Sequence, residues 1–282
     1  MKQSRLGRIW LQLVVIVCSI YFLVPLLSMA RFSFQRIQVF NLTWGKVFEG
    51  WTFESIGRVL DEKTFGPALW TSVRLAILTV ILTFVLMLPT ALWAHLRTPN
   101  WRPVVEFVTV LPYVIPPIAM VVGAIGTYRD AVPWFISSPY CLVPFYAVLA
   151  MPFTYRSLDA GLRSIPLATL TDASRSLGAG WWTTIVRVIV PNVRAALIGS
   201  AFLTITVCLG EFTIANLLLK KTLPIFNNEF QRRDGPAGTA LGLVTLFLIS
   251  LLLTLISSVT RRRRGTDVAS PIPTAGGAVQ PV

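Results

Sequence analysis

Charged side chains are scarce in this chain of 282 residues, and acidic ones are scarcer than basic ones. Asp and Glu together number 12, Lys and Arg together number 25, and all four make up 13% of the sequence. A soluble globular domain carries about 25% charged residues. With 54% hydrophobic residues and a mean hydropathy of +0.69, the chain has too little charge to cover a surface that water surrounds on every side. The composition excludes a soluble enzyme and predicts an integral membrane protein.

Residues that bind metals or nucleotides are also few. His95 is the single histidine, and Cys18, Cys141 and Cys208 lie inside apolar runs without metal-ligand spacing, which is typical of packing positions. The sequence has no G-x-x-x-x-G-K-[ST] phosphate-binding loop. An intramembrane enzyme would need nucleophiles, acids or ligands that converge at one depth, and the sequence offers no such set. We therefore expect no catalytic residue, no metal and no cofactor in this chain.

The net charge of +13 would indicate nucleic acid binding in a soluble protein. In a membrane protein, basic residues hold cytoplasmic loops against anionic lipid. We therefore assign this charge to contact with membrane lipid and expect no nucleic acid partner.

Six segments are apolar for long enough to cross a membrane as helices, which takes about 20 residues. The predicted spans are 9–30, 75–94, 107–128, 131–155, 195–219 and 235–260. The fifth is interrupted by Glu211, and we predict one helix that continues through Glu211 to Leu219. The first is longer than the apolar core of a signal peptide, which has about 7–15 residues, and indicates an uncleaved anchor. The pattern predicts an all-α, polytopic membrane protein.

The basic residues predict how these spans are oriented. The N-terminus carries Lys2, Arg5 and Arg8, and four arginines, Arg261 to Arg264, follow the last span. Because basic residues stay on the cytoplasmic side, both termini are predicted to be cytoplasmic. The outer segment 31–74 is typical of a small helical cap, and the tail 263–282 has too little apolar bulk to fold.

Prolines are concentrated in the third and fourth predicted spans and their connection. They are Pro112, Pro116, Pro117, Pro133, Pro139, Pro144 and Pro152. Proline bends a helix and frees backbone carbonyls. Irregular packing and a moving wall of a pathway both fit this pattern.

A long loop, 156–194, joins the fourth and fifth predicted spans, and it is longer than a simple connection requires. Ser164 and Pro166 are typical of a helix start. Apolar residues then recur at near-helical spacing, at Leu167, Leu170, Ala173 and Leu177. Gly178 and Gly180 predict a sharp turn, since glycine accepts a positive φ without strain.

A second helix is predicted after this turn and ends at Pro191. Its apolar face consists of Trp182, Ile185, Val186 and Ile189. The loop is therefore expected to form a short amphipathic helical hairpin under the membrane. On the pattern alone, a helix lying on the lipid surface is equally open.

The same loop contains a signature. The stretch DASRSLGAGWWTTIVRVIVP, from Asp172 to Pro191, resembles the loop signature of the permease subunits of binding-protein-dependent ABC importers. That signature reads Glu-Ala-Ala, three residues, Gly, nine residues, Ile, one residue, Leu-Pro, and the spacing is kept. The chain departs from it at Asp172, Ser174, Val188 and Val190. Asp172 has a shorter reach than the usual Glu, which could re-aim its contact.

The resemblance covers about residues 65–262. It implies a type I ABC importer permease fold (MetI-like) with six spans, in a bacterial inner membrane. The implied domains are 1–64, with the first span and an outer amphipathic segment, the permease core 65–262, and the tail 263–282. The hairpin at about 156–194 lies within the core.

In such importers, the first hairpin helix docks on a cytoplasmic ATPase subunit. The resemblance therefore implies an ATPase-coupling site formed by Asp172, Ala173, Ser174, Leu177, Gly178 and Pro191. It implies a dimer of ABC ATPase subunits that binds ATP and Mg, since this chain lacks a phosphate-binding loop. It also implies a second permease subunit, expected to be a different chain, and an extracytoplasmic solute-binding protein.

Polar residues follow one face of the predicted fifth span, at Ser200, Thr204, Cys208 and Glu211. An ionisable residue inside a span usually faces the bundle interior or a water-filled path. We predict that Ser200, Thr204 and Glu211 line a translocation path, with Glu211 near its outer gate. Alternatively, Glu211 lies near the outer headgroups or pairs with an arginine of a partner.

The segments LGEFTIANLL and TLPIFNNEF look most like permeases of the spermidine/putrescine-type branch. With a carboxylate in the path, this resemblance implies a small cationic cargo such as a polyamine. The branch also includes permeases for iron, thiamine and phosphonate, which are the alternative cargoes. A stand-alone secondary carrier or channel is a more distant alternative, because it leaves the hairpin signature unexplained.

Overall fold

The computed structural model describes residues 5–35 and 49–264. These residues are almost entirely helical, with one isolated β-bridge, between Gln35 and Trp51, and no β-strand among them. The α-helices are α1 (Arg5–Phe34), α2 (Glu54–Leu60), α3 (Phe65–Leu96), α4 (Arg102–Val114), α5 (Pro117–Ala131), α6 (Pro133–Ser137), α7 (Leu142–Arg163), α8 (Leu167–Ser176), α9 (Trp181–Thr183), α10 (Val190–Asn192), α11 (Arg194–Gly210), α12 (Thr213–Leu217), α13 (Leu223–Arg233) and α14 (Gly235–Arg264). Short 3₁₀ turns lie at Pro99–Trp101 and Pro139–Cys141, and Thr184–Ile189 is a π-helix. The all-α prediction is confirmed.

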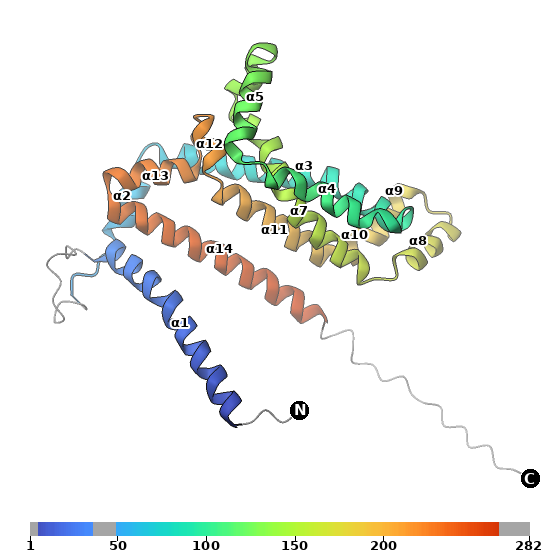
Figure 1. The fold of residues 1–282 in the computed structure, drawn as a ribbon, viewed down its shortest axis with the longest axis horizontal. Coiled ribbons are helices and arrows are strands. Elements are labelled where there is room, and N and C mark those ends of the chain that lie inside the picture. The colour runs from blue at the N-terminus through green and yellow to red at the C-terminus, as the bar shows by residue number, and fades with distance from the viewer. Residues whose placement is uncertain (1–4, 36–48, 265–282) are drawn as a thin grey trace, which may run out of the picture.

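Three long helices, α3, α7 and α11, pack against one another and form the centre of the molecule (Figure 1). They bury two apolar clusters, one at each end of the bundle. The first includes Leu75, Leu142, Tyr146 and Ile214, and the second includes Leu92, Tyr155, Leu158, Leu162 and Ile189. This packing fixes the positions of the loops at both ends.

Helices α7 and α11 approach each other closely. A Cβ atom on Gly161 would lie 2.4 Å from the Cβ of Ala196, so only glycine fits there. Next to it, the Ser157 hydroxyl donates a hydrogen bond to the Ala196 carbonyl at 3.0 Å. Further along the same pair, the hydroxyls of Thr154 and Thr204 are 3.1 Å apart and both buried. Small residues and interhelical hydrogen bonds are the usual means by which helices associate in a membrane.

The structure breaks the third predicted span. Instead of one helix over 107–128, α4 ends at Val114 and α5 begins at Pro117, with a bend of 84° between them. Ile115 and Pro116 are extended, since a residue before proline is disfavoured in the helical region. As a result α5 projects away from the rest of the bundle (Figure 1). The prolines therefore end and start helices here.

The other predicted spans differ mainly at their ends. The fourth is shifted, because Pro133 and Pro139 start separate short turns and the long apolar stretch is Pro139–Arg163, not 131–155. The second begins earlier, at Phe65. The fifth ends at Gly210, so the helix predicted to continue to Leu219 is wrong. The first and last spans lie within α1 and α14.

Within the described residues, three stretches are long and apolar enough to cross a membrane: Trp10–Phe34, Phe65–Leu96 and Pro139–Arg163. Two bent pairs, Pro99–Ala131 and Trp181–Gly210, meet the same test when each is taken together, and Gly235–Leu251 is a shorter apolar helix. Each of the six predicted segments overlaps one of these stretches.

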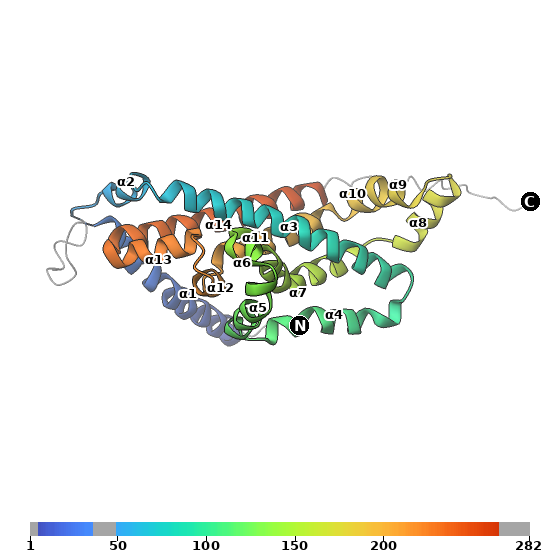
Figure 2. The same cartoon turned by 90° about the horizontal axis from the view of Figure 1, so that it is seen from above.

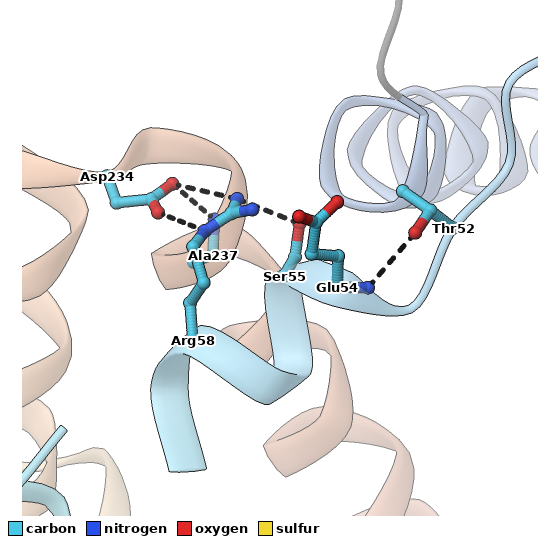
Figure 3. Close-up of polar contacts among 6 residues, drawn as sticks. All are labelled: Thr52, Glu54, Ser55, Arg58, Asp234 and Ala237. Carbon is cyan, nitrogen blue, oxygen red and sulfur yellow. Dashed lines mark hydrogen bonds and ion pairs between the residues drawn. The ribbon is translucent and has the colours of Figure 1, made fainter. Parts of the chain in front are cut away.

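The predicted outer cap is built around a polar contact between α2 and the start of α14 (Figure 3). The Arg58 guanidinium donates to the Asp234 carboxylate at 2.6 Å, and the Asp234 carboxylate also accepts from the Ala237 amide at 3.1 Å. Partial burial acts to raise the pKa of Asp234, but these two hydrogen bonds together hold its pKa below the ordinary 3.8. Asp234 thus stays ionised and fixes α2 on the first turn of α14.

The cap and the loop 156–194 lie at opposite ends of the long axis. Figures 1 and 2 both place α2 and α13 at one end and α8 and α9 at the other. Within the predicted outer segment, Trp44 and Phe48 lie outside the described residues, as does the tail 265–282. The disorder predicted for that tail stays a prediction.

The α7–α11 crossing gives a direct test. Gly161→Ala should destabilise the protein by about 1–3 kcal/mol, because the added methyl group overpacks the contact with Ala196. The measurement is the thermal unfolding midpoint of the full chain in mild detergent. Gly126→Ala on α5 is the control, since an added Cβ there meets no atom within 4 Å. An equal response of both variants would contradict the close approach.

Candidate functional site

The predicted loop 156–194 is shorter in the structure, because α7 continues to Arg163 and α11 begins at Arg194. The residues between these helices form a hairpin, which we define as α8, the turn 177–180, and the helical segments from Trp181 to Asn192. The first helix ends in a Schellman turn: the Gly178 amide donates to Arg175 O at 2.9 Å and the Ala179 amide to Ser174 O at 3.1 Å. Gly178 has φ +79°, so the glycine prediction is confirmed there. Gly180 has φ −70° and does not need that freedom.

A hydrogen bond joins the two arms of the hairpin. The hydroxyls of Ser174 and Thr184 lie 2.9 Å apart and are buried, and Thr184 also donates to the Gly180 carbonyl at 3.1 Å. Ser174 is a position where the signature has alanine. The departure from the signature therefore adds a polar link between α8 and the second arm.

The apolar stripe predicted on α8 does not form one buried face. Leu167 is buried and Leu170 is partly buried, while Ala173 is exposed and Leu177 is 88% exposed. The inward face of α8 instead consists of Leu167, Thr171 and Ser174. The predicted stripe runs from the bundle side to the outside because each of its two steps of three residues falls about 60° short of a full turn.

Two features of the predicted second helix are corrected. Residues 184–189 form a π-helix, in which Thr184 and Ile189 point inward five residues apart. Trp182 and Val186, predicted to share one apolar face with Ile189, are exposed, whereas Ile189 is buried. Pro191 does not end the helix, since α10 continues to Asn192 and the chain bends at Val193, by 79°, before α11.

The hairpin is attached to the bundle by one apolar cluster. Leu167 from α8, Ile189 from the π-helix and Val193 at the bend pack with Leu158 and Leu162 of α7. The Val193 amide donates to Ile189 O, and the Leu197 amide donates to Val193 O, both at 3.0 Å, so Val193 is hydrogen-bonded to the helical segments on both sides of the bend. The cluster thus joins the hairpin to α7, and Val193 joins the hairpin to the start of α11.

The polar face predicted on the fifth span lies between helices. Ser200 and Thr204 have no exposed surface, and their hydroxyls bond to Leu197 O, Ser200 O and the Thr154 hydroxyl. In this conformation these side chains face α7 and not a cavity. Their predicted role on a path stays a prediction.

Glu211 lies between two helices instead of within one. Its backbone is extended, with φ −79° and ψ 115°, and its carboxylate accepts hydrogen bonds from the amides of Ile214 at 2.9 Å and Ala215 at 3.3 Å. It therefore caps α12, where free amides favour a negative charge. The buried Tyr146 side chain also lies near this carboxylate. Gly210 before Glu211 was the sequence signal for this break.

Sequence reasoning missed a polar cluster at the end of the bundle that adjoins the hairpin. His95 of α3 places Nε2 3.3 Å from Asp159 Oδ1 of α7, and Arg163 donates to Asp159 Oδ2 at 2.8 Å. His95 Nδ1 lies 2.9 Å from Ala91 O. The four-residue spacing of Asp159 and Arg163 was visible in the sequence, but their proximity to His95 depends on the fold.

The comparison with protein families gives a decisive match. The model of the family described as "Binding-protein-dependent transport system inner membrane component" matches residues 76–265, which include the whole hairpin and α11. This chain belongs to that family of importer permeases. It is therefore a multi-pass membrane protein, and the resemblance drawn from the hairpin signature is confirmed.

Three relatives are similar to this permease along much of their length. The probable ABC transporter permease protein y4fN of Sinorhizobium fredii is 23% identical over 278 residues, which is 89% of this chain and 46% of that protein. This permease thus spans about half the length of that relative. The sulfate transport system permease protein CysW of Synechocystis sp. is 29% identical, over 70% of this chain and 78% of that protein. The spermidine/putrescine transport system permease protein PotB of Haemophilus influenzae is 22% identical, over 69% and 74%.

Solved structures share the fold of this permease. A chain of a bacterial ABC transporter involved in the import of the acidic polysaccharide alginate aligns with a TM-score of 0.61 at 16% identity, covering 96% of this chain and 100% of that one. A chain of the bacterial alginate ABC transporter in complex with alginate pentasaccharide-bound periplasmic protein gives 0.60 at 16% identity, covering 90% and 95%. The type I permease fold predicted from the sequence is confirmed.

The Schellman turn of the permease hairpin can be tested at Gly178. Gly178→Ala should cost about 1–2 kcal/mol, because φ +79° places a Cβ too close to the following carbonyl. The expected result is faster amide hydrogen exchange in the last turn of α8 and a lower unfolding midpoint. Gly180→Ala, where φ is −70°, should leave both nearly unchanged. Equal effects of the two variants would contradict this description of the turn.

Proposed function

We propose that this permease forms half of the translocation pore of an ATP-driven importer and that its hairpin couples the pore to a cytoplasmic ATPase. The observation that carries the proposal is the exposed tip of the hairpin. Leu177 is 88% exposed, and Asp172 and Ala173 are exposed beside it on α8. An exposed leucine on the same hairpin as an exposed carboxylate that has no partner among the described residues is a contact surface of the kind that a protein partner covers.

The hairpin has the mechanical properties that coupling requires. Its arms are held together by the Ser174–Thr184 hydrogen bond, and its inner face joins the apolar cluster of α7 and α11. A partner that grips Ala173 and Leu177 would move α8 as one body. The 79° bend at Val193 directs this movement into α11. Asp172 would meet a basic group of the ATPase and fix the register of the contact.

The remaining partners follow from the same proposal. Two ABC ATPase subunits would bind ATP and Mg, and a second permease subunit, expected to be a different chain, would complete the pore. A solute-binding protein would deliver cargo on the outer face; the alginate transporter was solved with its periplasmic protein, which supports such a partner. Closure of the ATPase dimer would bring the hairpins together and open the pore outward, and hydrolysis would reset it. Both termini would then be cytoplasmic.

The cargo is proposed on narrower grounds. A small cationic solute such as a polyamine is supported by Glu211 and by the likeness to a spermidine/putrescine permease. A second candidate, an oxyanion such as sulfate, is favoured by the likeness to a sulfate permease and by the fact that the Glu211 carboxylate already accepts two backbone amides. A test of Glu211 must therefore distinguish contact with the cargo from capping of α12.

Coupling is tested by co-purification of the tagged full chain with its native partners from mild detergent. Leu177→Asp should abolish recovery of the ATPase, since it places a carboxylate on an apolar contact. Leu219→Asp is the matched control, because Leu219 is also 88% exposed but lies in the loop between α12 and α13, toward the opposite end of the bundle. Recovery of the second permease should be unchanged in both. Retention of the ATPase by Leu177→Asp would refute the proposed coupling surface.

Cargo contact is tested by uptake of labelled putrescine, spermidine and sulfate with Glu211→Gln. If the carboxylate meets a cation in the path, KM for the polyamine should rise about 10-fold or more, as loss of a charge-assisted hydrogen bond predicts. If Glu211 only caps α12, the maximal rate should fall for whichever cargo is carried, with KM unchanged. This second outcome, or uptake of sulfate alone, would overturn the polyamine proposal.

A further inference from the structure

A groove lies between the end of α3 and the hairpin, and it shares Asp172 with the proposed coupling surface. It encloses about 980 Å³ and is lined by residues of two kinds. Its apolar wall includes Pro89, Leu92 and Leu96 of α3 and Ile185 of the second hairpin arm. Its polar rim carries Arg97, just beyond α3, and Arg175 of α8. A cavity that combines an apolar wall with guanidinium groups at one end matches an amphiphile with an anionic head.

The two arginines are available to a ligand. Both are exposed, and no hydrogen bond or ion pair joins either guanidinium to another residue in the described part of the chain. Asp172 also lines the groove, so its charged lining holds two cations and one carboxylate. A guanidinium donates two parallel hydrogen bonds to phosphate oxygens, which is the geometry that favours arginine at phosphate sites.

Tryptophans place this groove at the membrane surface. Trp93 and Trp181 line it from opposite sides and are about half exposed, at 49% and 48%. Trp101 and Trp182, in the neighbouring turns, are more exposed still. Tryptophan gathers at the level of the lipid headgroups, where its ring contacts acyl chains and its N–H reaches polar groups. These side chains therefore indicate that the groove opens at headgroup level.

We propose that the groove binds an anionic phospholipid, with the phosphate held between Arg97 and Arg175 and the upper acyl chain lying along Leu92, Leu96 and Ile185. Apart from Ile185, the apolar wall belongs to α3, inside the candidate span Phe65–Leu96, which a water-soluble ATPase subunit would not reach. A free phosphate would leave that wall uncovered. The lipid would bridge α3 and α8, so the composition of the membrane would bear on the position of the hairpin.

The lipid proposal rests on the proposed function in one respect: the proposed function assigns the groove to the side of the membrane on which the ATPase lies. Lipid retention is therefore measured by itself, by native mass spectrometry of the tagged full chain with its co-purifying subunits. The complex is offered equal amounts of phosphatidylglycerol and phosphatidylcholine. Wild type should retain phosphatidylglycerol selectively. Each basic residue near an anionic surface contributes about fivefold in affinity, so the Arg97→Gln/Arg175→Gln double variant should lose roughly 25-fold.

The matched control is Arg187→Gln, an exposed arginine in the π-helix of the same hairpin that does not line the groove. It should retain phosphatidylglycerol as wild type does. Equal loss of phosphatidylglycerol in the control would mean that the lipid is attracted to basic residues in general, and this would overturn the proposal. Full retention of phosphatidylglycerol by the double variant would also overturn it. Displacement of the lipid by inorganic phosphate would assign the site to a free anion. Binding only after removal of the ATPase or of the second permease would assign the groove to that subunit.

The two proposals fail separately. If wild type recovers no ATPase, the proposed function is refuted while the lipid comparison still stands. If the ATPase is recovered equally by wild type and by the double variant, and neither retains phosphatidylglycerol selectively, the lipid site alone is refuted. Equal gel-filtration profiles for all variants establish that the exposed substitutions leave the fold intact.

Discussion

A helix that stops inside a membrane exposes backbone amides or carbonyls that no water can satisfy, and most irregular features of this permease answer that constraint. Glu211 supplies its carboxylate to the free amides of α12. Lys220 supplies its ammonium group to the last carbonyls of α6, Ile136 O at 2.6 Å and Ser137 O at 2.8 Å. Asp234 supplies its carboxylate to the Ala237 amide in the first turn of α14. Charged residues thus occur where helices are interrupted.

The same constraint explains how the hairpin is held rigidly on the bundle. Val193 is hydrogen-bonded to Ile189 on one side of the bend and to Leu197 on the other, so the hairpin and α11 are linked by backbone as well as by side chains. The close crossing at Gly161 then ties α11 to α7. A force applied at the exposed end of α8 would pass along this route through packed and hydrogen-bonded residues. The outer cap, by contrast, is held to α14 by a partly exposed ion pair, and exposed pairs contribute at most about 1 kcal/mol.

Much of this was predictable from the sequence, because apolar length and signature spacing are local properties. The hairpin, its glycine turn and the positions of most spans follow from runs and periods that a reader can count. Three features do not. The break at Pro116 was visible as a proline pair, but its 84° bend depends on what α5 packs against. The residues of the second arm that face inward do not follow from an α-helical period, because residues 184–189 form a π-helix. Glu211 was predicted to lie inside a span. The chain instead leaves α11 at Gly210, one residue before Glu211, and the Glu211 carboxylate caps α12.

The π-helix gives the signature spacing a physical meaning. Thr184 reaches Ser174, and Ile189 reaches the bundle, only because an extra residue is accommodated between them. In an α-helix each residue advances the chain by about 100° around the axis. The number of residues between Gly178 and Pro191 therefore sets a rotational register between the hairpin tip and α11. A chain one residue shorter between Gly178 and Pro191 could keep the same order of apolar and polar residues. Its contact surface would still face the wrong side, so the length of this loop is itself part of the site.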